Sequence, residues 1–297
     1  MTTAESLIDP TKLYADIETP PQSLDGAGLD SELRDRADLG EESYRGSGRL
    51  TGRKALITGG DSGIGGATAI AFAREGADVA IVHLPQEQAD ADRILGLIEA
   101  EGRTGVSIAG DITDPDFCRE LVERTVSELG GLDILVNNAG KQQHIEGLDE
   151  LSDEEFDRTM KTNVYAMFWI TKAALPHLPA GSSIINTTSV QAYSPSGILV
   201  HYAMTKGAIN TWSKGLADQL APKGIRVNAV APGPIWTPLQ AAGGQPPEAL
   251  PETGSQTPIG RWGQPAELAP AFVYLASADA TYVAGATISV TGGMPTP

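Results

Sequence analysis

Seven short apolar segments, each followed by a stretch long enough for a helix or a long connection, recur along this 297-residue chain. They are KALIT at 54–58, DVAIVHL at 78–84, GVSIAGD at 105–111, LDILVNNAG at 132–140, SSIINTTS at 182–189, IRVNAVAPG at 225–233 and TISVTGG at 287–293. We interpret each as apolar along its length, which is the pattern of a strand buried on both faces of a parallel sheet. The chain therefore predicts a parallel sheet that is covered by helices on each side.

The alternation is continuous from about residue 51, which predicts one domain over residues 51–297. Its fold class is α/β: a doubly wound, Rossmann-type, seven-stranded parallel sheet with helices on both faces. Residues 1–50 contain Pro20-Pro21 and little apolar periodicity. We expect them to form an extended N-terminal arm that lies along the core or a neighbouring subunit. The proline- and glycine-rich segment 240–256 predicts a long loop that acts as a lid over substrate.

The net charge of −17 opposes binding to nucleic acid or to anionic membranes, because both contacts use lysine and arginine to neutralise phosphates. Such a charge fits either an acidic solvated surface or adaptation to high salt. No stretch approaches the roughly 18 consecutive apolar residues of a membrane span, and the N-terminus is acidic where a signal peptide is basic. The single cysteine, Cys118, and four scattered histidines indicate neither a disulfide nor a metal site. We expect a soluble, cytoplasmic protein.

The segment TGGDSGIGG at 58–66 joins the first predicted strand to the first predicted helix. Its glycines Gly59, Gly63 and Gly65 permit a tight turn and a close approach of ligand to backbone. The helix that follows presents unpaired N–H groups and a partial positive charge at its start. In this position the segment predicts a binding site for the pyrophosphate of a dinucleotide.

The end of the second predicted strand is where many dinucleotide-binding folds place an acid that binds the adenosine ribose. His83 stands in that position, and Leu84 follows it. Neither is an acid, and neither is the arginine or lysine that suits a 2′-phosphate. His83 therefore either contacts the ribose or only ends the strand, and the choice between NAD and NADP stays open.

Tyr202 and Lys206 stand four residues apart in YAMTKGAINTWSKGLADQL, so both side chains share one face of a helix. A phenol has a pKa of about 10, and a nearby ammonium together with a cationic nicotinamide would lower it. Tyr202 could then exchange a proton with an alcohol or a carbonyl. Ser189, at the end of the fifth predicted strand, could hydrogen-bond the substrate oxygen where charge develops. Because these side chains polarise the carbonyl, we expect a reaction that needs no metal.

In this combination of motifs the chain resembles the short-chain dehydrogenase/reductase family over about residues 51–297. The matching segments are TGGDSGIG after the first strand, DI at 111–112, NNAG at 137–140, KTN at 161–163 and PGPIWT at 232–237. By this resemblance the cofactor, NAD or NADP, is bound by Gly59, Asp61, Ser62, Gly63, Ile64, Gly65, His83, Leu84, Asp111, Ile112, Asn138, Ala139, Gly140, Tyr202, Lys206, Pro232, Gly233, Ile235 and Thr237.

The resemblance also implies a role for each of four catalytic residues. Tyr202 is the acid/base, and Lys206 lowers its pKa and binds the ribose hydroxyls. Ser189 polarises the substrate oxygen, and Asn163 positions a water on the proton path. The implied activity is an NAD(P)-dependent interconversion of an alcohol with an aldehyde or ketone.

The substrate itself is expected to contact Ser189, Gln191 and Tyr202. Gln191 and Tyr193 could line the substrate pocket or only satisfy the loop in which they lie. The lead-in GEESYRGSGRL and the segment SQTPIGRWGQPAELAPAFVYLAS are similar to a bacterial subgroup with an N-terminal arm. That subgroup is labelled general stress protein or aldehyde reductase and is related to glucose/ribitol dehydrogenase-like members.

The family resemblance further implies a homotetramer, with contacts through helices at 115–129 and 155–178 and through the C-terminal strand. Two alternatives remain. One is a non-catalytic dinucleotide-binding stress or sensor protein that retains the fold without turnover. The other is an enoyl reductase, in which the tyrosine and lysine usually stand six residues apart rather than four.

Overall fold

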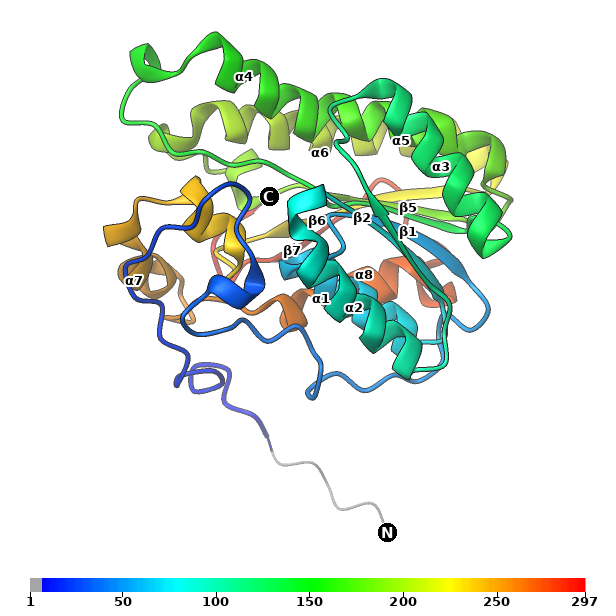
Figure 1. The fold of residues 1–297 in the computed structure, drawn as a ribbon, viewed down its shortest axis with the longest axis horizontal. Coiled ribbons are helices and arrows are strands. Elements are labelled where there is room, and N and C mark those ends of the chain that lie inside the picture. Colours follow the sequence, from blue (N-terminus) through cyan, green and yellow to red (C-terminus); the bar gives the residue numbers. More distant parts are fainter. Residues whose placement is uncertain (1–6, 297) are drawn as a thin grey trace.

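The computed structural model describes residues 7–296, which are built around a seven-stranded sheet in the order β3-β2-β1-β4-β5-β6-β7 (Figure 1). The strands are β1 Lys54–Thr58, β2 Asp78–His83, β3 Gly105–Ala109, β4 Ile134–Asn137, β5 Ser183–Thr187, β6 Arg226–Pro232 and β7 Thr287–Val290. Every neighbouring pair is parallel. The order reverses beside β1, where β4 pairs with it on the side opposite β2. The predicted doubly wound fold is confirmed.

Helices cover both faces of the sheet and close an apolar core on each. One face carries α1 Gly63–Arg74, α2 Gln88–Ala100 and α8 Pro265–Ala276, and the other carries α3 Pro115–Leu129, α5 Ala166–Ala174 and α6 Val200–Leu220. Because successive side chains of a strand point to opposite faces, Ala55 and Ile57 enter the first core and Leu56 enters the second. Burial on both faces explains why the central strands are apolar along their length.

The last strand, β7, departs from the predicted pattern of complete burial. Thr287, Ile288 and Val290 are partly exposed and Ser289 is exposed, because β7 is the edge strand next to β6. The sequence TISV alternates polar and apolar residues, which is the signature of a half-covered strand. A homotetramer that uses this strand stays a prediction.

The segment 240–256 was expected to be a long loop, and this expectation is wrong. It forms consecutive short helical turns, among them α7 Leu250–Thr253. The turns are held to the core because Leu250 is fully buried and its carbonyl accepts a hydrogen bond of 3.0 Å from the Trp262 indole. Ala241 and Leu250 supply apolar contacts to the core, although the many prolines and glycines of the segment had indicated a loop.

The arm lies along the core of its own chain, as irregular backbone with a 3₁₀ turn at Asp30–Glu32. It contributes Leu33, Leu39 and Leu50 to the core on the α1 side. Its backbone is also bonded to the domain, since the Trp236 indole donates to the Asp35 carbonyl at 2.8 Å. The arm is therefore part of the folded unit rather than a free extension.

Glu75, at the end of α1, forms the most densely bonded contact between arm and domain. Its side chain is fully buried and accepts hydrogen bonds from the Tyr44 hydroxyl at 2.6 Å, from the Ser47 and Arg49 amides at 2.9 Å each and from the Arg49 guanidinium at 2.8 Å. Burial alone would raise the pKa of Glu75, but the bonds from Arg49 and Tyr44 outweigh it and lower the pKa to about 2. The carboxylate therefore stays charged and ties residues 44–49 to α1.

We expect Glu75→Gln to lower the free energy of unfolding by about 3 kcal/mol, because it leaves a partly buried arginine without its charge partner. Denaturant unfolding measures this loss. The control is Glu128→Gln, whose partner Arg124 and own side chain are both substantially exposed, so a change of at most about 1 kcal/mol is expected. Because the folded pKa lies below the unfolded value, the contribution is complete above about pH 5 and lost as the pH falls towards 2. Equal stability of the two variants would contradict the role of Glu75.

Candidate active site

A cavity of about 870 Å³ opens at the carboxyl ends of the strands, beside the point where the strand order reverses. Open parallel sheets place their ligand sites at this position. The predicted residues that line it are Gly59, Asp61, Ser62, Gly63, Ile64, His83, Leu84, Asp111, Ile112, Asn138, Ala139, Gly140, Ser189, Gln191, Tyr202, Lys206, Pro232, Gly233, Ile235 and Thr237. Gly65 and Asn163 lie behind this wall rather than in it.

The glycine turn forms one end of the cavity. Gly59 and Gly63 have φ values of +62° and +49°, a region that side chains disfavour. At Gly65 a Cβ would lie 1.8 Å from the Gly59 carbonyl oxygen, so only glycine allows α1 to start this close to β1. The Asn138 amide fastens the turn by donating to the Thr58 and Gly59 carbonyls at 3.1 Å each. The result is a bare stretch of backbone at the start of a helix, which fits a pyrophosphate.

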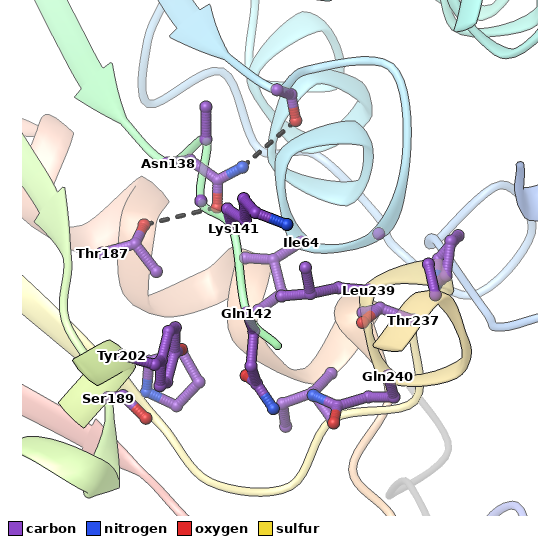
Figure 2. Close-up of a pocket in the computed structure, with 18 of the residues that line it drawn as sticks. Ile64, Asn138, Lys141, Gln142, Thr187, Ser189, Tyr202, Thr237, Leu239 and Gln240 are labelled. Atoms are coloured by element: carbon purple, nitrogen blue, oxygen red, sulfur yellow. Dashed lines mark hydrogen bonds between the residues drawn. The ribbon is translucent and has the colours of Figure 1, made fainter. Parts of the chain in front are cut away.

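Ser189 and Tyr202 meet at the other end of the cavity, where Figure 2 shows them side by side and facing Gln142 and Gln240. β5 ends just before Ser189, and Tyr202 lies in the first turn of α6. The residues are only 6% and 7% exposed. A substrate oxygen placed between their hydroxyls would be within reach of both.

Lys206 lies one turn after Tyr202 on α6 and is also buried. Its Nζ is 5.4 Å from the centre of the Tyr202 ring and donates to the Thr187 carbonyl at 2.8 Å. An ammonium has three hydrogens, so this bond leaves two for a ligand in the cavity. The helix spacing therefore brings the phenol and the ammonium together as the sequence predicted.

The pKa of Tyr202 differs from the sequence expectation. Burial raises it to about 12, although a hydrogen bond with Ser189 opposes the rise. Burial also lowers the pKa of Lys206 to about 8. The predicted depression of the phenol pKa by Lys206 is thus not found in the protein alone, because the effect of burial outweighs the hydrogen bond with Ser189.

Asn163 lies in a π-helical turn, Lys161–Tyr165, which separates α4 Asp153–Met160 from α5. Its side chain accepts from the Lys141 amide at 2.7 Å and donates to the Lys141 carbonyl at 2.9 Å and to the Thr205 hydroxyl at 3.0 Å. Thr205 in turn donates to the Tyr202 carbonyl at 2.7 Å. Asn163 therefore connects the chain after β4 to the helix turn that carries Tyr202.

His83 is buried at the end of β2, and both of its ring nitrogens are in use. Nδ1 lies 2.8 Å from the Leu84 carbonyl and Nε2 lies 2.8 Å from the Ser107 hydroxyl. The ring thus ties β2 to β3, although it touches the cavity wall. Of the two interpretations of His83, these contacts support the strand-ending one.

Acidic side chains do line the cavity beside β2, but none of them stands at the end of β2, where an acid that binds the ribose is expected. Asp61 lies in the glycine turn, and Glu87 accepts a hydrogen bond of 2.7 Å from the Leu84 amide. Burial raises the pKa of Asp61 to about 6 and that of Glu87 to about 8, and Asp61 adds to the rise at Glu87. Asp61 was expected among the cofactor-binding residues, whereas the place of Glu87 depends on how the start of α2 meets the glycine turn, which its sequence position alone does not indicate.

Further lining residues were missed at the substrate end and at the mouth. Gln142 is 5% exposed and donates to the Gly244 carbonyl at 2.7 Å, which leaves its own oxygen as an acceptor. Gly26 and Ala27 of the arm also line the cavity. The KQQH run directly after the NNAG motif was a usable signal for Gln142, whereas nothing in the composition of the arm pointed to Gly26.

Within residues 7–296, no three histidine, cysteine, aspartate or glutamate side chains are grouped so that they could hold a metal ion. In the same part of the chain, none of the helices combines the length and apolar character needed to cross a membrane.

Comparisons with known proteins agree with this geometry. A family model described as enoyl-(acyl carrier protein) reductase matches residues 59–295. The uncharacterized oxidoreductase YhxD of Bacillus subtilis is 54% identical, over 98% of each chain. The glucose and ribitol dehydrogenase homolog 2 of Arabidopsis thaliana is 41% identical, over 93% of this chain and 97% of its own. A short-chain dehydrogenase from Burkholderia cenocepacia, solved in complex with NADP, superposes with a TM-score of 0.77 and 36% identity, covering 82% of this chain and 98% of its own.

Proposed function

This chain is an oxidoreductase that belongs to the short-chain dehydrogenase/reductase family, and we propose that it interconverts an alcohol with an aldehyde or ketone, using NAD or NADP. The observation that carries the proposal is the placement of Ser189 and Tyr202 side by side in the cavity wall, with Lys206 one helix turn behind. The four-residue spacing of Tyr202 and Lys206 favours this reaction over enoyl reduction. The family model's description therefore does not decide the substrate.

The site fits a nicotinamide dinucleotide. The glycine turn offers bare backbone and the start of α1 to the pyrophosphate, and Asn138, Gly140 and Thr237 lie along the same cavity. Lys206 has two N–H groups left for ribose hydroxyls. When bound, the dinucleotide supplies the hydride acceptor or donor.

In the proposed mechanism Tyr202 holds the transferred proton on its Oη. Because burial raises its pKa to about 12, the phenol is protonated at neutral pH and can donate to a substrate carbonyl oxygen. Ser189 donates a hydrogen bond to the same oxygen and stabilises the charge that develops there. Lys206 stabilises the phenolate that is left, and Asn163 keeps α6 in register with the chain after β4. A water on the path from Tyr202 remains part of the proposal.

We infer a neutral, hydroxyl-rich substrate. The substrate end carries amide side chains that are already oriented: Gln142 keeps a free oxygen, and Gln191 accepts from the Ser196 amide at 2.7 Å and keeps a free NH₂ group. The nearby cation Lys141 is paired with Glu155 at 3.2 Å. The two amides offer hydrogen bonds and the nearby Lys141 is already paired, which suits a polyol or sugar, in agreement with the name of the Arabidopsis relative.

The proposal is tested by titrating the protein with NADH and NADPH, followed by fluorescence, and then by assaying reduced-nicotinamide absorbance with neutral polyols, neutral aldehydes and hydroxy acids. We expect binding, and a kcat/KM at least about tenfold higher for neutral polyols or their aldehydes than for hydroxy acids of equal size, since the lining leaves a carboxylate unpaired. A preference for hydroxy acids would contradict the substrate class. Binding without turnover of any compound would favour the non-catalytic alternative.

A further inference from the structure

Seven residues of the arm, 24–30, cross the mouth of the cavity, and we name this segment the strap. Gly26 and Ala27, at its middle, line the same cavity as the glycine turn and the catalytic end. The arm, blue in Figure 1, passes close to α7 and then reaches the side of α1. The strap is therefore a wall of the site that comes from outside the seven-stranded domain.

One end of the strap is fixed to the helical segment that follows β6. The Leu24 amide donates to the Ala241 carbonyl at 3.0 Å. Gly28, at φ +75°, packs so closely that a Cβ on it would lie 3.2 Å from the Ala242 Cβ. Ala241 and Ala242 come shortly after Thr237, which in turn contacts Gly63 of the glycine turn. This anchor therefore sits beside the expected pyrophosphate site.

The other end is fixed to α2 through Asp30, which is 2% exposed. Its amide donates to the Asp90 carboxylate at 2.7 Å, and its own carboxylate pairs with Arg93 at 2.9 Å. Burial raises the pKa of Asp30 to about 7, and the charge of Asp61 adds to the rise. Asp61 lines the cavity in the glycine turn, so this second anchor also lies near the expected dinucleotide site.

We propose that the strap closes over the phosphates and adenosine ribose of the bound dinucleotide, and that it must open before the dinucleotide can leave. Its two anchors lie on different elements, the chain after β6 and α2, and its middle carries only glycine and alanine, so it presents backbone to the cavity and leaves room for a ligand beneath. When contacts of one interface are changed, affinity changes mainly through the dissociation rate. We therefore expect the strap to lower the rate at which the dinucleotide dissociates. This inference rests on the proposed function, because it needs a dinucleotide in the cavity.

The test compares two truncations of the full chain. Deleting residues 1–29 removes the strap but keeps Asp30 and the buried Leu33 and Leu39. Deleting residues 1–22 removes the preceding part of the arm and keeps the strap. NADH release is followed by stopped-flow fluorescence after mixing with excess NAD, and the shorter chain should release NADH at least about tenfold faster than the control. Equal release rates in the two truncations would overturn the strap, whereas failure of the wild type to bind either NADH or NADPH would overturn the proposed function as well.

A disulfide that fixes the strap to the core provides a second test if the chain without residues 1–29 fails to fold. The pair Gly28→Cys and Ala242→Cys would place two Cβ atoms about 3.2 Å apart, near the separation of about 3.5–4.5 Å that a disulfide requires, and a thermal melt shows whether the protein tolerates a side chain at the positive φ of position 28. The native Cys118 is buried and will not compete. Oxidation should slow NADH release at least about tenfold, dithiothreitol should restore it, and neither single-cysteine variant should respond. A locked protein that exchanges NADH as fast as its reduced form would show that release does not require opening of the strap.

Discussion

The Tyr202→Phe variant is expected to lose about 10³-fold in kcat while its Kd for NADH stays nearly unchanged. The substitution keeps the buried ring and its contacts and removes only the hydroxyl that holds the proton. Ser189, Lys206 and the glycine turn are left in place, so dinucleotide binding has no reason to change. Single-turnover kinetics together with fluorescence titration separate the two quantities.

The matched control is Tyr193→Phe, which makes the same chemical change at a second tyrosine nine residues earlier in the sequence. Tyr193 donates to Asn210 at 3.1 Å and does not line the cavity, so this variant should change kcat no more than about threefold. It also settles the earlier alternative that Tyr193 contacts substrate. An ordinary kcat in Tyr202→Phe would mean that another group supplies the proton.

The raised pKa of Tyr202 also predicts how the two reaction rates depend on pH. Carbonyl reduction needs the protonated phenol, which is the prevailing form well below pH 12, and the charged Lys206, whose pKa is about 8, so its rate should be flat from about pH 6 to 7. Alcohol oxidation needs the phenolate and should accelerate as the pH rises. The acceleration of alcohol oxidation with pH should be lost in Tyr202→Phe, since the hydroxyl that accepts the proton is gone.

Local patterns in the sequence predicted the parts of the fold that local chemistry determines. The buried strands β1 and β2 are recognisable because burial on both faces requires apolar residues at every position. Tyr202 and Lys206 are recognisable as a pair because helix geometry alone places them on one face. The glycine turn is recognisable because its backbone conformation excludes side chains at Gly59 and Gly63.

The remainder depends on contacts between segments that are distant in sequence. His83 sits where a ribose ligand was expected, but its ring is used by Ser107 on the neighbouring strand. The strap reaches the cavity because Leu24 bonds to Ala241 after β6 and Asp30 pairs with Arg93 on α2. The segment 240–256 folds into helical turns because Leu250 finds a place in the core. Such pairings leave no periodic trace in composition or spacing, so they could not be predicted from the sequence.

The Gly65→Ala variant should weaken NADH binding by at least about 100-fold, the loss expected when a backbone seat for the pyrophosphate is displaced. The added Cβ would lie 1.8 Å from the Gly59 carbonyl oxygen and 2.6 Å from the Asn138 Nδ2, so the turn or the start of α1 must move. The Asn138 bonds to Thr58 and Gly59 would be lost with it. Isothermal titration with NADH measures the change, and a thermal melt shows whether the variant is folded.

Gly96→Ala is the control for the glycine-to-alanine change itself. A Cβ at Gly96 meets no atom within 4 Å, and the residue lies inside α2, where alanine is favoured over glycine by about 0.5–1 kcal/mol. This variant should bind NADH as the wild type does and unfold at a slightly higher temperature. If folded Gly65→Ala bound NADH equally well, the pyrophosphate would have to be held elsewhere than at the glycine turn, and the close packing of α1 against β1 would serve the stability of the fold alone.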